Sequence, residues 1–116
     1  MRSAAVTETA PYRLACEADD VKPGSATVVR VGEREVALFH VEDRIYALDN
    51  RCPHAGGPLA EGTVIGSTVI CSWHCAAFDL ETGESLDSIS RWDADAYAVR
   101  VEEGKVWVRI DDEEEE

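Results

Sequence analysis

Two cysteines and two histidines lie in two short segments of the chain. One residue separates Cys52 from His54, sixteen residues follow, and two residues then separate Cys71 from His74. Thiolate sulfur and imidazole nitrogen both bind metal ions, and two of each are the ligands of a 2Fe-2S cluster with mixed cysteine and histidine ligation. The pattern therefore predicts a one-electron redox centre at these four residues.

Zinc is the alternative metal for the same donors, because it also binds two thiolates with two imidazoles. Zinc sites usually pair like residues, as C-x2-4-C and H-x3-5-H, whereas cysteine and histidine alternate in this chain. The spacing favours the cluster over zinc, and over cysteines and histidines with no metal-binding role. The colour of the purified protein would distinguish an iron-sulfur cluster from zinc, since an iron-sulfur protein absorbs visible light and a zinc protein does not.

Short apolar segments separated by polar turns make up most of the chain. Such segments are typical of β-strands, and no window shows a convincing helical period, although residues 87–96 could hold a helical turn. The expected strands lie at residues 28–31, 36–41, 45–48, 97–101 and 106–110, the last two forming a terminal hairpin. The sequence predicts an all-β fold, an antiparallel β-sandwich or small barrel.

The spacer between the two ligand pairs has a hairpin pattern of its own. Residues 64–65 and 69–70 are apolar and flank Gly66 and Ser67. A hairpin here would return the chain, so that the loop at residues 52–57 lies beside the loop at residues 71–77. We also expect Gly56 and Gly57 to allow backbone N-H groups to approach the metal centre closely.

Residues 51–83, RCPHAGGPLAEGTVIGSTVICSWHCAAFDLETG, resemble the cluster-binding region of Rieske-type 2Fe-2S ferredoxins. The flanking strands are similar too, so the resemblance covers about residues 11–110. It implies a Rieske-like fold with a cluster-binding subdomain of two loops, and one Rieske 2Fe-2S cluster per chain. It also implies that Cys52 and Cys71 hold the inner iron, and that His54 and His74 hold the outer one.

The resemblance implies a soluble electron carrier rather than an enzyme. Its partners would be an NAD(P)H-dependent flavin reductase and a terminal Rieske oxygenase, as in aromatic-ring dioxygenase systems. The alternatives are the small Rieske subunit of an assimilatory nitrite reductase and a zinc-stabilised interaction module. A self-sufficient oxygenase would need a second iron site with two histidines and a carboxylate, but only His40 remains outside the cluster ligands.

Composition sets the size and surroundings of the domain. A chain of 116 residues with 45% apolar content suits one domain, at residues 11–110, with a flexible N-terminus at 1–10 and an acidic disordered tail at 111–116. The net charge is −13, and the tail carries six of these charges, which leaves −7 on the rest. We therefore expect no nucleic-acid partner. With no transmembrane or signal segment, we expect a cytoplasmic monomer without a membrane partner.

Four positions near the ligands bear on the reduction potential. The high-potential Rieske proteins of respiratory complexes carry a disulfide between the loops, where this chain has Gly57 and Trp73. They also place serine and tyrosine hydroxyls near the sulfurs, where it has Ala76 and Phe78. Fewer hydrogen bonds to the sulfurs disfavour the reduced state, so we expect a potential near the bottom of the range of roughly −150 to +300 mV.

Five other reactive or aromatic residues need an interpretation. Cys75 follows the second ligand histidine, at a position that is usually glycine in the resembling ferredoxins, and we read it as structural. His40 and Cys16 have no partner at ligand spacing, so we also expect structural roles for them. We expect Trp92 and Trp107 to lie in the core.

Overall fold

The computed structural model describes residues 12–53, 56–73, 75–86 and 92–110. In chain order the elements are β1 (Tyr12–Glu17), η1 (Ala18–Asp20), β2 (Ala26–Val31), β3 (Arg34–Val41), β4 (Arg44–Asp49), η2 (Leu59–Glu61), β5 (Thr63–Ile65), β6 (Thr68–Ile70), β7 (Ala77–Asp79), β8 (Ala96–Glu102) and β9 (Lys105–Arg109). Both helices are single 3-10 turns. The prediction of an all-β fold is confirmed.

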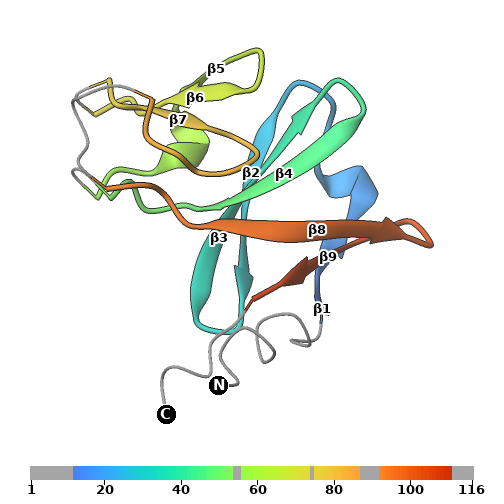
Figure 1. Ribbon diagram of the computed structural model, residues 1–116. Coiled ribbons are helices and arrows are strands. Elements are labelled where there is room, and N and C mark those ends of the chain that lie inside the picture. Colours follow the sequence, from blue (N-terminus) through green and yellow to red (C-terminus); the bar gives the residue numbers. More distant parts are fainter. Residues whose placement is uncertain (1–11, 54–55, 74, 87–91, 111–116) are drawn as a thin grey trace.

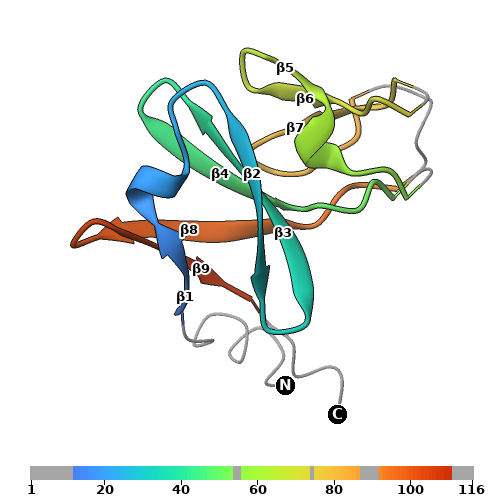
Figure 2. The same ribbon diagram turned by 180° about the vertical axis from the view of Figure 1, so that it is seen from behind.

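Two antiparallel sheets make up the fold (Figure 1). The larger has the order β1-β9-β8-β4-β3-β2, and its edge strands β1 and β2 approach each other, so that it nearly closes into a barrel. The smaller has the order β5-β6-β7 and lies with the ligand-bearing loops at one end of the molecule, as both views show (Figure 2). The expected small barrel and the separate subdomain with two loops are therefore observed, and cluster binding by these loops stays a prediction.

Strand β3 is covered on both faces, which explains its continuous apolar run VALF. Val36 and Leu38 point into the barrel and pack with residues of β9 such as Val108. Ala37 and Phe39 point the other way, into the core between the two sheets. The smaller sheet is thus anchored on β3, and the loops that it carries are held by a packed core.

The predicted hairpins and turns agree with the structure. The β2–β3, β3–β4 and β5–β6 connections are two-residue turns, and so is the β8–β9 turn, whose central residues Glu103 and Gly104 both have positive φ. Two positive φ values are the requirement of a type I′ turn, which matches the twist of a two-stranded ribbon. Val106 and Val108 of the terminal hairpin are buried, while Trp107 between them is half-buried.

Some expectations are corrected or fall outside the described residues. Trp92 is 58% exposed, so its assignment to the core was wrong. It follows the segment 87–91, which lies outside the described residues, and residues 92–95 contain no helical turn. The predicted terminal segments 1–10 and 111–116 also lie outside them. No helix among the described residues has the length and apolar character needed to cross a bilayer.

Candidate metal centre

Two hairpin loops of equal length carry the predicted ligands. Residues 52–57 are closed by a bridge between Arg51 and Pro58, and residues 71–76 by the pairing of Ile70 with Ala77 at the ends of β6 and β7. The β5–β6 hairpin returns the chain from the first loop to the second, as the spacer pattern predicted. Sixteen residues of sequence therefore become a short distance in space.

The same pair of backbone hydrogen bonds closes each loop. In the first, Cys52 N-H donates to the carbonyl of Gly57 (2.8 Å), and Gly56 N-H donates to the carbonyl of Cys52 (2.7 Å). In the second, Cys71 N-H donates to the carbonyl of Ala76 (2.7 Å), and Cys75 N-H donates to the carbonyl of Cys71 (3.1 Å). The two loops thus present Cys52 and Cys71 in equivalent positions.

A left-handed residue occupies the fifth position of each loop. Gly56 has φ +81° and Cys75 has φ +64°. Glycine adopts this conformation without steric cost, whereas a residue with a Cβ is strained in it. The sequence already indicated a role for glycine in the first loop. In the second loop, Cys75 occupies the position equivalent to Gly56. This equivalence explains why the ferredoxins that the sequence resembles usually have a glycine at the position of Cys75.

The two cysteine side chains meet between the loops. Cys52 and Cys71 are 1% and 0% exposed, and both belong to the core between the sheets. Burial raises the pKa of the Cys71 thiol, the N-H of Trp73 lowers it, and the hydrogen bond and charge of the neighbouring Cys52 raise it again. Two adjacent buried thiols fit the sulfur half of the predicted ligand set, because they can bind one metal ion together without reaching into solvent.

Trp73 joins the two loops. Its backbone N-H lies 3.4 Å from the sulfur of Cys71 and donates to it. Its indole ring lies against Gly57 of the first loop, where an added Cβ would be 2.7 Å from the ring. The ring is nevertheless 49% exposed. Trp73 therefore packs between the two loops and also reaches the surface.

His54 and His74, the other two predicted ligands, lie outside the described residues. Among the residues that are described, no group of three or more histidines, cysteines, aspartates or glutamates is placed to hold a metal ion. Beside the cysteines, Ala76 and Phe78 are fully buried. Neither side chain carries a hydroxyl group, so neither can donate a hydrogen bond to a sulfur.

Two of the remaining sequence candidates, His40 and Cys16, lie away from this centre. His40 Nδ1 lies 2.8 Å from the carbonyl of Val21, which fixes the imidazole within the barrel region. Cys16 packs against the barrel core, and burial together with Asp20 and Glu17 raises its thiol pKa. Cys75 is exposed. The structural roles expected for His40 and Cys16 agree with these contacts.

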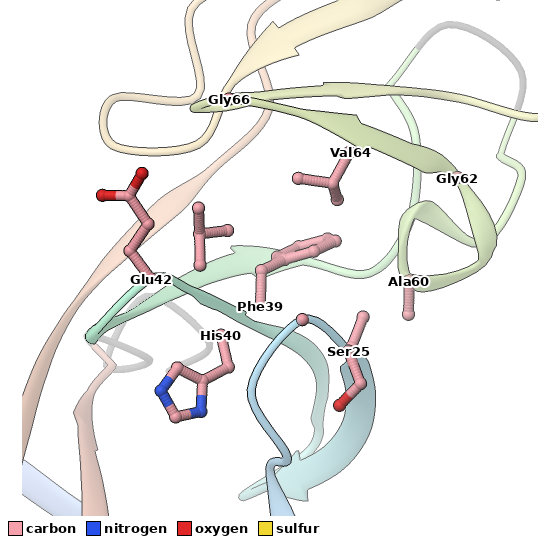
Figure 3. Close-up of a pocket in the computed structure, with 11 residues that line it drawn as sticks. Ser25, Phe39, His40, Glu42, Ala60, Gly62, Val64 and Gly66 are labelled. Carbon is pink, nitrogen blue, oxygen red and sulfur yellow. The ribbon is translucent and has the colours of Figure 1, made fainter.

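A cavity of about 340 Å³ lies between the two sheets on the side of β3 and the β5–β6 hairpin (Figure 3). Phe39 and Val64 form part of its wall, Glu42 and Ser25 lie at its border, and Ala60 of η2 closes one side. Neither Cys52 nor Cys71, the two predicted ligands that the structure describes, lines it. The cavity is therefore distinct from the pair of cysteines.

Sequence reasoning missed the residues that support the first loop. Asn50 is buried, and its side-chain oxygen accepts the N-H of Ala60 (2.9 Å) while its carbonyl accepts the N-H of Leu59 (2.7 Å). Asp49 accepts the N-H of Arg51 (2.9 Å). The only signal was a polar pair, Asp49 and Asn50, at the end of a predicted strand, and such pairs are also common in ordinary turns.

Known proteins resemble this chain over most of its length. The family model described as "Rieske [2Fe-2S] domain" matches residues 12–98. The ferredoxin component of the naphthalene 1,2-dioxygenase/salicylate 5-hydroxylase systems of Ralstonia sp is 33% identical over 93 residues, which are 80% of this chain and 89% of that protein.

Two solved structures show the same arrangement of strands. A chain in a complex of reduced oxygenase and oxidized ferredoxin in carbazole 1,9a-dioxygenase has a TM-score of 0.74 at 35% identity, covering 82% of this chain and 98% of that one. A protein assigned as the small subunit of an NADH-dependent nitrite reductase from Mycobacterium tuberculosis has a TM-score of 0.78 at 29% identity, covering 88% and 97%.

Proposed function

Because this chain belongs to the Rieske [2Fe-2S] domain family, we propose that it is a one-electron carrier and not itself a catalytic enzyme. The observation that carries the proposal is the pair of buried, adjacent thiols of Cys52 and Cys71, which are the first residues of two matched loops. When bound, a 2Fe-2S cluster supplies a centre that accepts and releases a single electron.

The proposed ligands are the thiolates of Cys52 and Cys71 on one iron and the imidazoles of His54 and His74 on the other. The chain's own residues would exclude water from the thiolate side, since both cysteines are almost inaccessible to solvent. They would also supply N-H donors to sulfur, as Trp73 does to Cys71. Backbone donors at the sulfurs stabilise added negative charge, which is how a protein tunes such a centre.

The proposed electron acceptor is the terminal oxygenase of an aromatic-ring dioxygenase system, and the proposed donor is an NAD(P)H-dependent flavin reductase. The similarity to the Ralstonia ferredoxin component and to the ferredoxin-oxygenase complex supports the oxygenase as acceptor. The strongly acidic surface supports docking to a partner with a basic patch. Such docking weakens as salt screens the charges.

Stopped-flow mixing of the dithionite-reduced protein, freed of excess reductant, with an oxidised aromatic-ring oxygenase tests this proposal. We expect the carrier to be reoxidised within the mixing experiment, at a rate that falls as ionic strength rises. A mock reaction without oxygenase is the control. Reoxidation at the same rate with and without the oxygenase, in anaerobic buffer, would contradict the assignment of the acceptor.

The small subunit of a nitrite reductase is the second candidate, favoured by the similarity to the Mycobacterium tuberculosis protein. A subunit remains bound to its large catalytic partner, whereas a carrier must leave one partner to reach the next. Gel filtration with a nitrite reductase large subunit separates the two candidates. Co-elution at micromolar concentration supports the subunit, and separate elution supports the carrier. Iron and zinc analysis of the purified protein distinguishes both from a zinc-stabilised module.

A further inference from the structure

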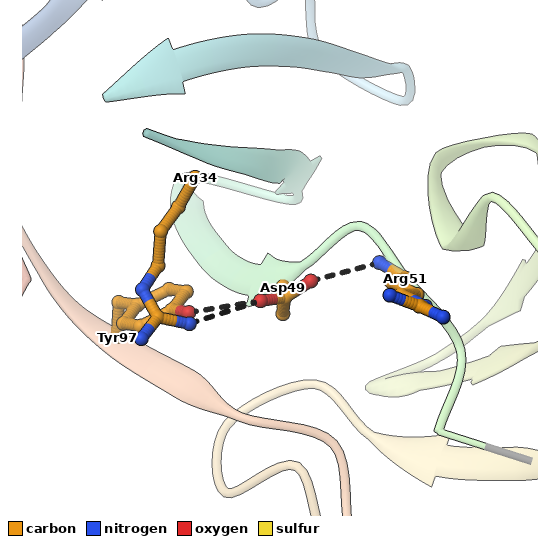
Figure 4. A network of polar contacts seen from close by, with 4 residues as sticks. All are labelled: Arg34, Asp49, Arg51 and Tyr97. Atoms are coloured by element: carbon orange, nitrogen blue, oxygen red, sulfur yellow. Dashed lines mark hydrogen bonds and ion pairs between the residues drawn. The ribbon is translucent and has the colours of Figure 1, made fainter. Parts of the chain in front are cut away.

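Asp49, the last residue of β4, is the centre of a polar network beside the first ligand loop (Figure 4). Its Oδ2 accepts the hydroxyl hydrogen of Tyr97 on β8 (3.1 Å) and pairs with Nη1 of Arg34 on β3 (3.6 Å). Its Oδ1 accepts the backbone N-H of Arg51 (2.9 Å). One carboxylate therefore connects β3, β8 and the backbone that enters the first ligand loop.

The bond to Arg51 lies directly before Cys52. The next N-H, that of Cys52, already closes the ligand loop on Gly57. Because Asp49 accepts the N-H of Arg51 and Gly57 accepts the N-H of Cys52, two consecutive backbone N-H groups are fixed where the chain enters the loop. The leaving side is held separately, by Asn50 through its bonds to Leu59 and Ala60.

The Asp49 side chain is only 22% exposed, and Arg34 is 33% exposed. Partial burial strengthens hydrogen bonds to a charged group, and a charged acceptor makes stronger bonds than a neutral one. The backbone N-H of Asp49 also donates to the carbonyl of Asp95 (2.8 Å), so the carboxylate and its own main chain are both restrained. Asp49 is thus a rigid support rather than a mobile surface charge.

We propose that Asp49 is a positioning residue for the first ligand loop: it holds the backbone entering Cys52 and so sets the geometry and electronic environment of that ligand. The inference rests on the proposed function, because it concerns a loop proposed to hold the cluster. Tyr97 and Arg34 act through it, by holding the carboxylate in the orientation that accepts the Arg51 N-H.

Asp49→Asn and Tyr97→Phe test this, with Asp79→Asn as the matched control. Asp79 ends β7 and its Oδ1 likewise accepts a backbone N-H two residues on, from Glu81 (2.8 Å). Asp79→Asn therefore removes one negative charge from the same kind of turn. This turn lies after the second ligand loop, at the end of β7. Tyr97→Phe changes no charge at neutral pH, so it separates positioning from simple electrostatics.

Three measurements are made on the cluster-loaded proteins: the electron paramagnetic resonance spectrum after reduction, the reduction potential, and hydrogen exchange of a peptide containing Arg51. We expect Asp49→Asn to shift the g-values and to speed exchange in that peptide about tenfold, and Tyr97→Phe to change both in the same direction by less. We expect Asp49→Asn to favour the reduced state about threefold, or ~28 mV for one electron. Asp79→Asn should leave the g-values and the exchange of the Arg51 peptide unchanged.

Equal effects of Asp49→Asn and Asp79→Asn on all three measurements would overturn the inference. They would show that Asp49 acts only through its negative charge and not by holding the loop backbone. Unchanged g-values and exchange in both Asp49→Asn and Tyr97→Phe would overturn it too. A wild-type protein that shows no paramagnetic signal after reduction would instead contradict the proposed function. The two failures are therefore distinguishable.

Discussion

Gly57 in the first ligand loop lies against the indole ring of Trp73 in the second. A Cβ on Gly57 would come within 2.7 Å of Cγ and Cδ2 of the ring, closer than side chains pack. These are the two positions that carry the disulfide in the high-potential Rieske proteins of respiratory complexes. In this chain, packing of an aromatic ring on a glycine takes the place of that covalent link between the loops.

Gly57→Ala should destabilise this contact between the loops. Gly57 is buried and its φ is not in the left-handed region, so the cost comes from the clash with Trp73 rather than from the backbone. We expect a loss of ~1–3 kcal/mol in the free energy of unfolding, as for overpacking in a well-packed core. Chemical denaturation of the cluster-loaded protein measures it.

Trp73→Ala is the control for the same contact. In the double variant the methyl group added at position 57 would no longer meet the ring, so the Gly57→Ala change should cost much less in the Trp73→Ala background. If the losses in the free energy of unfolding from Gly57→Ala and Trp73→Ala were additive in the double variant, the contact with Trp73 would not be what limits the size of residue 57.

Cys75→Gly should stabilise the second loop. Cys75 holds φ +64° with an exposed side chain, at the position that Gly56 occupies in the first loop. Relief of the left-handed strain outweighs the extra entropy of a glycine in the unfolded chain, by ~0.5–1 kcal/mol. The free energy of unfolding measures it, and Gly56→Ala should have the opposite sign. A destabilised Cys75→Gly variant would mean that the thiol makes a contact worth more than the strain.

Ala76→Ser should raise the reduction potential. Ala76 is fully buried and follows the left-handed residue of the second loop, where a hydroxyl would be held near the ligand sulfurs. A hydrogen bond that is ~1–1.5 kcal/mol stronger in the reduced state raises a one-electron potential by about 40–60 mV. Protein-film voltammetry measures the shift, with Ala98→Ser on the exposed face of β8 as the control. A shift of zero or of opposite sign would contradict the account.

Alkaline pH should reduce the stability that Tyr97 of β8 contributes through its hydrogen bond to Asp49 at the end of β4. Burial, and then the negative charge of Asp49, raise the pKa of Tyr97 above its ordinary value of 10.0. A folded-state pKa above the unfolded one means that the stabilisation is complete below about pH 10 and is lost as pH rises further. The free energy of unfolding of Tyr97→Phe should therefore fall less steeply than that of the wild type above pH 10. Parallel pH profiles would exclude this role for Tyr97.

The strands and turns followed from local patterns. Val106 and Val108 alternate with Trp107, and the apolar run of β3 is long because both its faces are buried, so periodicity and turn residues located these elements. The return of the spacer was also predictable, because Gly66 and Ser67 divide two apolar pairs. Each of these features depends on neighbours in sequence.

The contacts that join distant segments could not be predicted in this way. Trp92 has the composition of a core residue, yet it is exposed, because nothing in its local sequence reports how the chain packs around it. The hydrogen bond from Tyr97 to Asp49 spans 48 residues. The packing of Trp73 on Gly57 depends on the pairing of two loops. Such relationships depend on the tertiary arrangement rather than on sequence spacing.

Pulsed electron paramagnetic resonance of the reduced protein is the most direct test of the proposed ligand set. When the protein is produced in cells supplied with 15N-labelled histidine, its reduced form should show two 15N nuclei bound directly to the cluster iron. Each of His54→Ala and His74→Ala should remove one of them or abolish the cluster, while His40→Ala should retain both. An iron-free protein, or an unchanged spectrum after replacement of both His54 and His74, would contradict the account.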